Sequence, residues 1–147
     1  MQTREMSMCI MAVALLAATL TVVAQPASEQ RLAAVSLTGA AEVPGPGDSN
    51  GTGTVTLTIK PATGEVCYDL TVANMQEATA AHLHEGAVGQ EGPVKVSLEA
   101  PKTGTAQGCT RVEAALLQTL LENPANYYVN VHNAEFPKGA VRGQLVK

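Results

Sequence analysis

Several short stretches of this chain alternate between apolar and polar residues, and this alternation restricts its fold more than any other feature. In VTLTIK, the apolar residues Val55, Leu57 and Ile59 occupy every second position, with threonines between them. Successive side chains of a β-strand point to opposite faces, so the pattern predicts a strand with one buried face. The stretch EVCYDLTV at 65–72 repeats the pattern, and the intervening KPATGE supplies the proline and glycine of a turn. Together the two stretches predict a hairpin.

Five further stretches also predict strands, at 32–39, 79–84, 93–99, 127–132 and 140–146. The segment TRVEAALLQTLLENP instead predicts a helix, with Thr110 as its cap, Glu113 three residues later and Pro124 as its end. About seven short strands with one helix in a crossover predict an all-β fold, either an antiparallel β-sandwich or a flattened Greek-key barrel. The longest predicted loop, VPGPGDSNGTG at 43–53, is the one we expect to be least ordered, and its role is left open.

The first 24 residues predict a secretory signal peptide that takes no part in the fold. Arg4 precedes an apolar run from Met8 to Val23, which is short for a membrane span, and Ala24 with a valine two residues before it suits a signal peptidase. Cleavage after Ala24, or alternatively after Ala27, leaves one domain at 25–147 that is secreted or periplasmic. A retained N-terminal anchor is the other interpretation of this segment.

Two cysteines remain once the signal peptide, which contains Cys9, is removed. Cys67 and Cys109 form an even number in a chain exported to oxidising surroundings, so we expect a disulfide between them. The bond would close a loop of about 40 residues and stabilise the fold by about 3 to 4 kcal/mol on a chain-entropy estimate. Paired thiol ligands are the weaker alternative, because the chain has no CxxC spacing.

Charge and composition exclude several function classes. The net charge is −4 and stays so without the signal peptide, which carries Arg4 and Glu5, so the chain lacks the basic surface that nucleic acid requires. It has no tryptophan, three tyrosines and one phenylalanine, too few rings for a platform that stacks sugars or bases. No GxSxG motif or suitably spaced carboxylate pair is present, which leaves hydrolysis only through a metal-bound water. We expect no membrane span in 25–147, and we leave the partner open, an extracellular or periplasmic protein being one candidate.

All three histidines lie in two of the predicted strands. His82 and His84 of AHLHEG are two residues apart and share one face, while Ala81 and Leu83 face the opposite way. In YYVNVH, His132 lies on the polar face and the two valines lie on the other. If these two strands are neighbours in one sheet, the three imidazoles converge.

A converging cluster of His82, His84 and His132 would suit copper or zinc, because neutral imidazole binds both metals and three protein ligands leave one position open. Glu85 and Glu135 follow the histidines closely and could complete the coordination or orient a ring from behind. Two alternatives stay open. The histidines could form a structural network with backbone carbonyls or carboxylates, or they could be scattered over the surface.

With these residues in view, the chain resembles the CHRD domain, a module first described in chordin. The blocks that carry the resemblance are LTGAAEVPGPG, TGEVCYDLTV, AAHLHEGAVGQEGPVKVSL and the closing segment from GCTRVEAALLQ to KGAVRGQL. The resemblance covers nearly all of 25–147. It implies a secreted, bacterial-type, single-domain β-sandwich module with no general enzymatic activity.

The leading interpretation is therefore a non-enzymatic binding or structural module whose functional cluster is the three histidines. A copper- or zinc-binding protein that uses His82, His84 and His132 is the alternative, and a metal-dependent enzyme is less favoured. No cofactor beyond copper or zinc is indicated.

Overall fold

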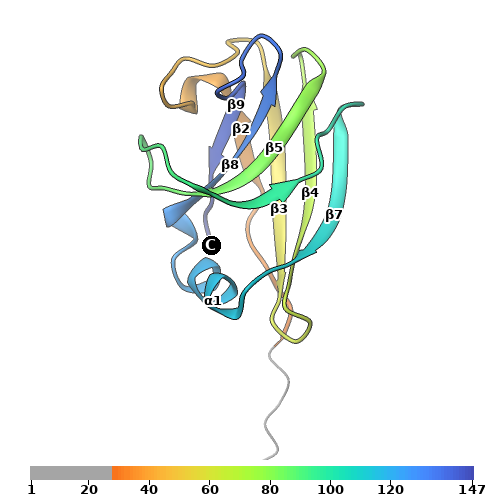
Figure 1. Cartoon of the computed structure of the whole chain (residues 1–147), viewed down its shortest axis with the longest axis vertical. Coiled ribbons are helices and arrows are strands. Elements are labelled where there is room, and N and C mark those ends of the chain that lie inside the picture. Colours follow the sequence, from red (N-terminus) through yellow and green to blue (C-terminus); the bar gives the residue numbers. More distant parts are fainter. Residues whose placement is uncertain (1–27) are drawn as a thin grey trace, which may run out of the picture.

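The computed structural model describes residues 28–147, so the predicted signal peptide lies outside the described residues. The described chain contains nine β-strands, one α-helix and two short 3-10 helices (Figure 1). The strands are β1 (Gln30–Arg31), β2 (Val35–Thr38), β3 (Thr52–Lys60), β4 (Glu65–Ala73), β5 (Ala78–Glu85), β6 (Val94–Leu98), β7 (Thr105–Arg111), β8 (Tyr127–Asn133) and β9 (Val141–Gln144). The helices are η1 (Gly39–Ala41), α1 (Ala114–Glu122) and η2 (Pro124–Asn126).

These strands build a single antiparallel sheet that curls into a nearly closed barrel (Figure 1). Their order is β6-β5-β8-β9-β2-β3-β4-β7, with β1 paired to β3. The predicted hairpin is the long β3–β4 pair, which runs from Thr52 opposite Ala73 to Lys60 opposite Glu65. The all-β prediction is confirmed. The described residues hold more strands than the seven or so expected because the sequence pattern missed β1 and β7.

The apolar faces of the strands fill the barrel. Val55, Leu57 and Ile59 of β3 are buried there, as their alternation predicted. α1 lies at one end of the barrel (Figure 1) and adds Leu117 and Leu120 to the same core. Within residues 28–147, no helix combines the length and the apolar character that crossing a bilayer requires.

The start of α1 differs from the prediction. Thr110 is not a helix cap, because it lies within β7, opposite Val66 of β4. The helix begins at Ala114, after an extended Glu113 whose side chain makes no capping hydrogen bond, and ends before Pro124 as predicted. The hydrogen bonds between β7 and β4 outweigh the local capping preference of Thr110, because they satisfy backbone groups along the whole of β7.

A disulfide joins Cys67 of β4 to Cys109 of β7, which confirms the expected pairing. The two residues are direct partners in the β4–β7 ladder, so the bond fastens an edge strand to the sheet. The sequence of β7, TAQGCTR, is small and polar with no apolar alternation. Its strand structure therefore comes from pairing with β4 and not from a local pattern.

The loop predicted at 43–53 is packed against the end of the barrel. The amide of Asp48 donates to the carbonyl oxygen of Ala140, which leads into β9. Oδ1 of Asp48 in turn accepts from the amides of Asn50 and Gly51, which brings the chain into β3. A buried aspartate thus attaches this loop to the barrel on both sides, while the expectation that the loop is the least ordered stays a prediction.

Candidate metal centre

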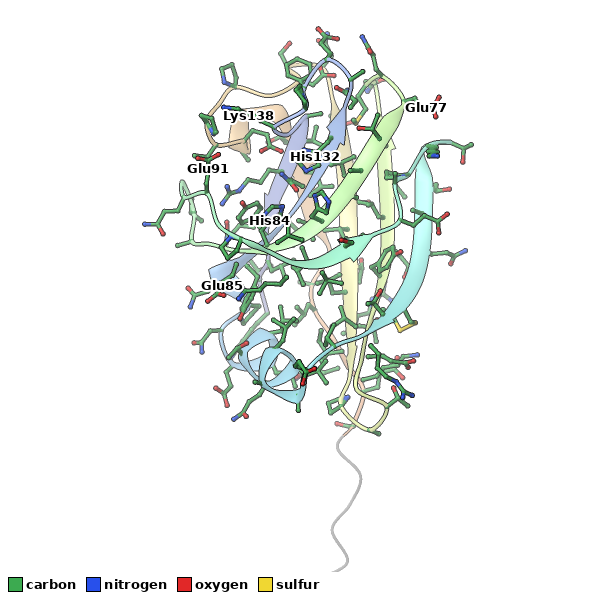
Figure 2. All side chains as sticks on the ribbon, viewed as in Figure 1. Glu77, His84, Glu85, Glu91, His132 and Lys138 are labelled. Atoms are coloured by element: carbon green, nitrogen blue, oxygen red, sulfur yellow. A yellow bond between two sulfur atoms is a disulfide. The ribbon has the colours of Figure 1, made fainter. Side chains whose placement is uncertain are left out.

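The two strands that carry the histidines are neighbours. β5 and β8 pair antiparallel, with His82 opposite Asn130 and His84 opposite Tyr128. Figure 2 shows His84 and His132 on these two strands. The alternate residues of both strands, which include Leu83, belong to the barrel core, so the histidines project from the opposite face of the sheet.

The three imidazoles converge, as this pairing requires. Nδ1 of His82 lies 3.0 Å from Nε2 of His132. The ring centroid of His82 is 5.5 Å from that of His84 and 4.9 Å from that of His132. One nitrogen from each ring can be chosen so that all three lie within 4.8 Å of one another. The predicted neighbourhood of the two strands and the predicted cluster are both confirmed.

His84 has one nitrogen fixed by the backbone and the other free. Its Nδ1 lies 2.8 Å from the carbonyl oxygen of Gly92, and since a carbonyl only accepts, Nδ1 carries the proton. Nε2 of the neutral ring then holds a lone pair. This atom is buried and has no hydrogen-bond partner among the described residues. A histidine that donates one N–H to a carbonyl and leaves the other nitrogen bare has the arrangement usual for a metal ligand.

His132 has the same arrangement. Its Nδ1 lies 3.1 Å from the carbonyl oxygen of Pro137, so this nitrogen carries the proton and Nε2 has the lone pair. Nε2 faces the cluster, where Nδ1 of His82 and Oδ1 of Asn130 are 3.0 Å and 3.1 Å away. Nε2 is thus the unprotonated nitrogen in both His84 and His132, and of these two only that of His84 has no hydrogen-bond partner among the described residues.

The cluster favours neutral rings. Burial lowers the pKa of His82, and the neighbouring His132 and His84 lower it further. Burial likewise lowers the pKa of His132, and this effect exceeds the opposing effect of the Pro137 carbonyl. Neutral imidazole is the form that binds metal ions, so the surroundings keep these two rings ready for coordination near neutral pH.

A stack of side chains supports the cluster from β8 and β9. The Tyr128 ring stacks on His84 with centroids 4.8 Å apart and nearly parallel planes. Arg142 of β9 lies over the Tyr128 ring and is only 2% exposed. Its guanidinium donates to the carbonyl oxygens of Gln90 and Ala87 at 2.8 and 3.1 Å. Arg142 therefore ties the loop at 86–92 to the sheet beside the histidines.

Gly92 ends this loop and supplies the carbonyl that fixes His84. A Cβ at this position would overlap the carbonyl oxygen of Glu85, so only glycine fits. The amide of Gly92 donates to the hydroxyl of Tyr128 at 3.2 Å. The close approach of Gly92 to Glu85 thus places the carbonyl group that sets the tautomer of the His84 ring.

A buried carboxyl group lies near Arg142 and Asn130. Glu42, which follows η1, is only 5% exposed, and its Oε1 has no hydrogen-bond partner among the described residues. Burial raises the pKa of Glu42 to about 7, against the lowering effects of Arg142, the Val43 amide and the Asn130 side chain. Gly139 packs so tightly on the carboxyl group that a Cβ there would overlap it.

Neither of the supporting carboxylates proposed from the sequence is brought into the cluster. Glu85 alternates with His84 along β5 and forms an ion pair with Lys95 at 2.6 Å. Glu135 accepts a hydrogen bond from Gln76 at 2.7 Å. In residues 28–147 the group of side chains placed closely enough to hold a metal ion consists of the three histidines.

The sequence did not single out Arg142 or Glu42. Period-two alternation in AVRGQLV places Arg142 on the polar face of its strand, and a lone arginine there looks like an ordinary exposed residue. Glu42 lies outside any predicted strand. A signal for both would have required knowing that the loops at 39–51 and 86–92 fold over the outer face of β5, β8 and β9.

Comparison with known proteins finds one family. The family model described as CHRD domain matches residues 33–145, nearly the whole of the described fold. No curated protein and no solved structure gives a significant match.

Proposed function

The chain belongs to the CHRD domain family, and from that premise we propose that it is an exported CHRD module that binds one copper or zinc ion through His82, His84 and His132. The bare, buried Nε2 of His84 carries the proposal. A buried nitrogen with a lone pair and no donor costs free energy, and a bound cation removes that cost.

The distances in the cluster allow binding with a small adjustment. Copper and zinc bind imidazole at about 2.0–2.1 Å, so two ligands of one ion lie at most about 4.2 Å apart. The separation of 3.0 Å between His82 and His132 fits within this limit. The three nitrogens lie within 4.8 Å of one another, and bringing the widest pair to the about 3.4 Å of a tetrahedral site needs a side-chain movement of about 1.4 Å.

A structural network is the competing function, and the His82–His132 contact favours it. If His82 carries its proton on Nδ1, it donates to Nε2 of His132 over 3.0 Å. The cluster then stabilises the β5–β8 pair without any ion. This network leaves Nε2 of His84 unsatisfied, which is why we rank it second.

We propose a binding role and no reaction. A metal-dependent hydrolase would need a base within hydrogen-bond reach of a metal-bound water. Glu85 and Glu135, the carboxylates nearest to the histidines in the sequence, are engaged with Lys95 and Gln76. An extracellular or periplasmic protein partner stays a prediction.

Isothermal titration of the purified protein with Cu(II) and with Zn(II) tests the proposal. We expect micromolar or tighter binding of at least one ion, and loss of that binding in the variant His82→Ala/His84→Ala. Glu85→Gln is the matched control, because it alters the neighbouring residue on β5 without touching the cluster. Wild-type protein that binds neither ion, with a double variant that is merely less stable, would establish the structural network instead.

A further inference from the structure

The two end strands of the sheet do not pair with each other, so the barrel has a seam. β6 and β7 are these end strands, and each has one neighbouring strand. One end of the seam is closed by a side chain, because the hydroxyl of Tyr68 accepts a hydrogen bond from the amide of Glu99, just after β6, at 2.9 Å. Gly108 of β7 leaves room for this contact, since a Cβ there would lie 2.8 Å from the Tyr68 hydroxyl.

The other end of the seam is open. A cavity of about 720 Å³ lies there, between β6, β7 and α1. Figure 1 shows β7 running down the edge of the barrel to α1. Val96 of β6, Val112 after β7 and Leu116 of α1 give the cavity apolar surface. Val112 and Leu116 pack against the core yet are only partly buried, so an apolar group placed in the cavity would extend the core.

The free edge of β7 presents unpaired backbone groups beside this cavity. Gly104 precedes β7 and Val112 follows it, and both hydrogen-bond on the β4 side, to Val72 and Gly64. In an antiparallel pair these bonds recur at every second residue, and the β4–β7 register has no shift. The even-numbered residues of β7 therefore bond to β4, and the odd-numbered residues direct their amide and carbonyl groups to the free edge.

Three residues carry these groups along the seam, namely Gln107, Cys109 and Arg111. Within residues 28–147, no hydrogen bond reaches their amides or carbonyl oxygens. Arg111 also lines the cavity. A row of unpaired donors and acceptors on a strand edge is a template for one more strand.

An extended peptide suits this edge better than a folded partner or a small ligand does. β6 and α1 stand across the cavity from β7, which leaves no room for the sheet edge of a second folded barrel. A single extended chain fits, because neighbouring strands lie only about 4.8 Å apart. Every second side chain of such a chain would share the face of Thr110 and enter the cavity. A small ligand would leave the row of backbone groups unpaired.

We propose that the free edge of β7 binds an extended peptide segment of a partner protein as an added strand, and that apolar side chains at alternate positions of this segment occupy the cavity between β6, β7 and α1. In this mode of recognition the main-chain hydrogen bonds supply affinity and the cavity selects the side chains. The site contains none of the three histidines, so the proposal does not depend on a metal ion.

A peptide selected on the unaltered protein supplies the probe. Selection from a random seven-residue library displayed on phage should enrich peptides with apolar residues at every second position. A synthetic copy of an enriched peptide should shift the backbone amide resonances of Cys109 and Arg111 in an NMR titration, while that of Ser36 stays in place. Failure to obtain any peptide that moves these resonances would overturn the proposal. So would the same shifts on concentrating the protein without peptide, since they would indicate a second copy at this edge.

Methylation of the peptide backbone separates an added strand from a peptide that is held by its side chains alone. Alternate amides of an added strand face β7, so we compare two copies of the peptide, one methylated at the odd amide nitrogens and one at the even. One copy should lose affinity by about tenfold or more, and the other should stay within about threefold of the parent peptide. Equal affinities of the two copies would exclude an added strand.

Arg111 offers a matched pair of variants. Arg111→Pro removes the N–H that faces the free edge and leaves the hydrogen bonds between β7 and β4 intact, and an edge strand tolerates proline at such a position. Arg111→Ala also lacks the arginine side chain but keeps the N–H. We expect the proline variant to bind the peptide about tenfold more weakly than the alanine variant. Equal binding by both variants would rule out pairing at this edge.

The cavity is tested from α1, at two adjacent alanines that are both exposed. Ala115 lines the cavity and Ala114 does not. Ala115→Trp should fill the cavity and weaken peptide binding by about tenfold or more, whereas Ala114→Trp should keep the affinity within about threefold. Equal peptide affinity of the two variants would contradict the proposed place of the peptide side chains.

Discussion

The guanidinium carbon of Arg142 lies 3.4 Å from the centroid of the Tyr128 ring, and the same ring stacks on His84. A buried positive charge is costly unless it is compensated. Arg142 is compensated by the face of Tyr128 and by the carbonyl oxygens of Ala87 and Gln90. One side chain therefore joins the sheet, the 86–92 loop and the ring that supports a candidate metal ligand.

Replacing Arg142 should destabilise the whole fold. We expect Arg142→Met to lower the free energy of unfolding by about 2 to 4 kcal/mol, because it leaves two loop carbonyls without donors. Urea denaturation of the purified protein measures this. Lys60→Gln is the control, since among the described residues the Lys60 side chain makes only a long surface contact with Glu29 at 3.9 Å, and the change should alter stability by less than about 0.5 kcal/mol. A loss for Arg142→Met no larger than the control's would contradict the compensation described above.

Glu42 should make stability fall as the pH rises. Its pKa is about 7 in the folded chain against 4.5 for an exposed glutamate, so between these values the folded state binds more protons than the unfolded state. Stability is then lost as the pH rises through this window, by about 3 kcal/mol in total. Glu42→Gln cannot ionise, so we expect it to match the wild type near about pH 5 and to be more stable at about pH 8.

The histidines change the stability with pH in the opposite direction, so their contribution must be separated from that of Glu42. The folded-state pKa values of His82 and His132 are lowered from 6.5, so their contribution is present above that pH and is lost on acidification below it. Urea denaturation at each pH gives the free energy of unfolding of the wild type and of Glu42→Gln. The histidine contribution drops out of the difference between the two values, because both proteins contain it. A stability difference between the two that does not grow with pH would show that Glu42 ionises normally.

Breaking the disulfide should lower the melting temperature. The bond between Cys67 and Cys109 closes a loop with a sequence separation of 42, and on the chain-entropy estimate it contributes about 3 to 4 kcal/mol. We expect a thiol reductant to lower the midpoint by roughly 10 °C. The variant Cys67→Ala/Cys109→Ala should melt at that lower temperature with or without reductant. An unchanged midpoint in the reduced wild type would mean that the bond adds nothing to stability.

The signal peptide predicted at 1–24 implies a shortened chain after export. Mass spectrometry of the protein recovered outside the cytoplasm should give an N-terminus at Gln25, or at Ser28 if cleavage follows Ala27. The same measurement on whole cells supplies the unprocessed mass as a control. A full-length mass in the exported fraction would favour a retained anchor.

Much of the fold was predictable because strand patterns are local. The alternation of Val55, Leu57 and Ile59 places these side chains on one face of any strand, whatever the strand pairs with. The same rule put His82 and His84 on one face of β5 and Leu83 on the other, and the structure confirms it. β7 was missed because TAQGCTR has no alternation, and its pairing with β4 alone makes it a strand.

The sequence by itself determined which face of each alternating strand is apolar, that two cysteines lie in 25–147, and that all the histidines lie on polar faces. The tertiary structure alone decided that β5 lies beside β8, that Gly92 and Pro137 fix the tautomers of His84 and His132, and that Glu42 and Arg142 are buried near each other. The reason is physical. The direction of a side chain depends on the backbone of its own residue, whereas its neighbours and its burial depend on closure of a sheet from segments far apart in the chain.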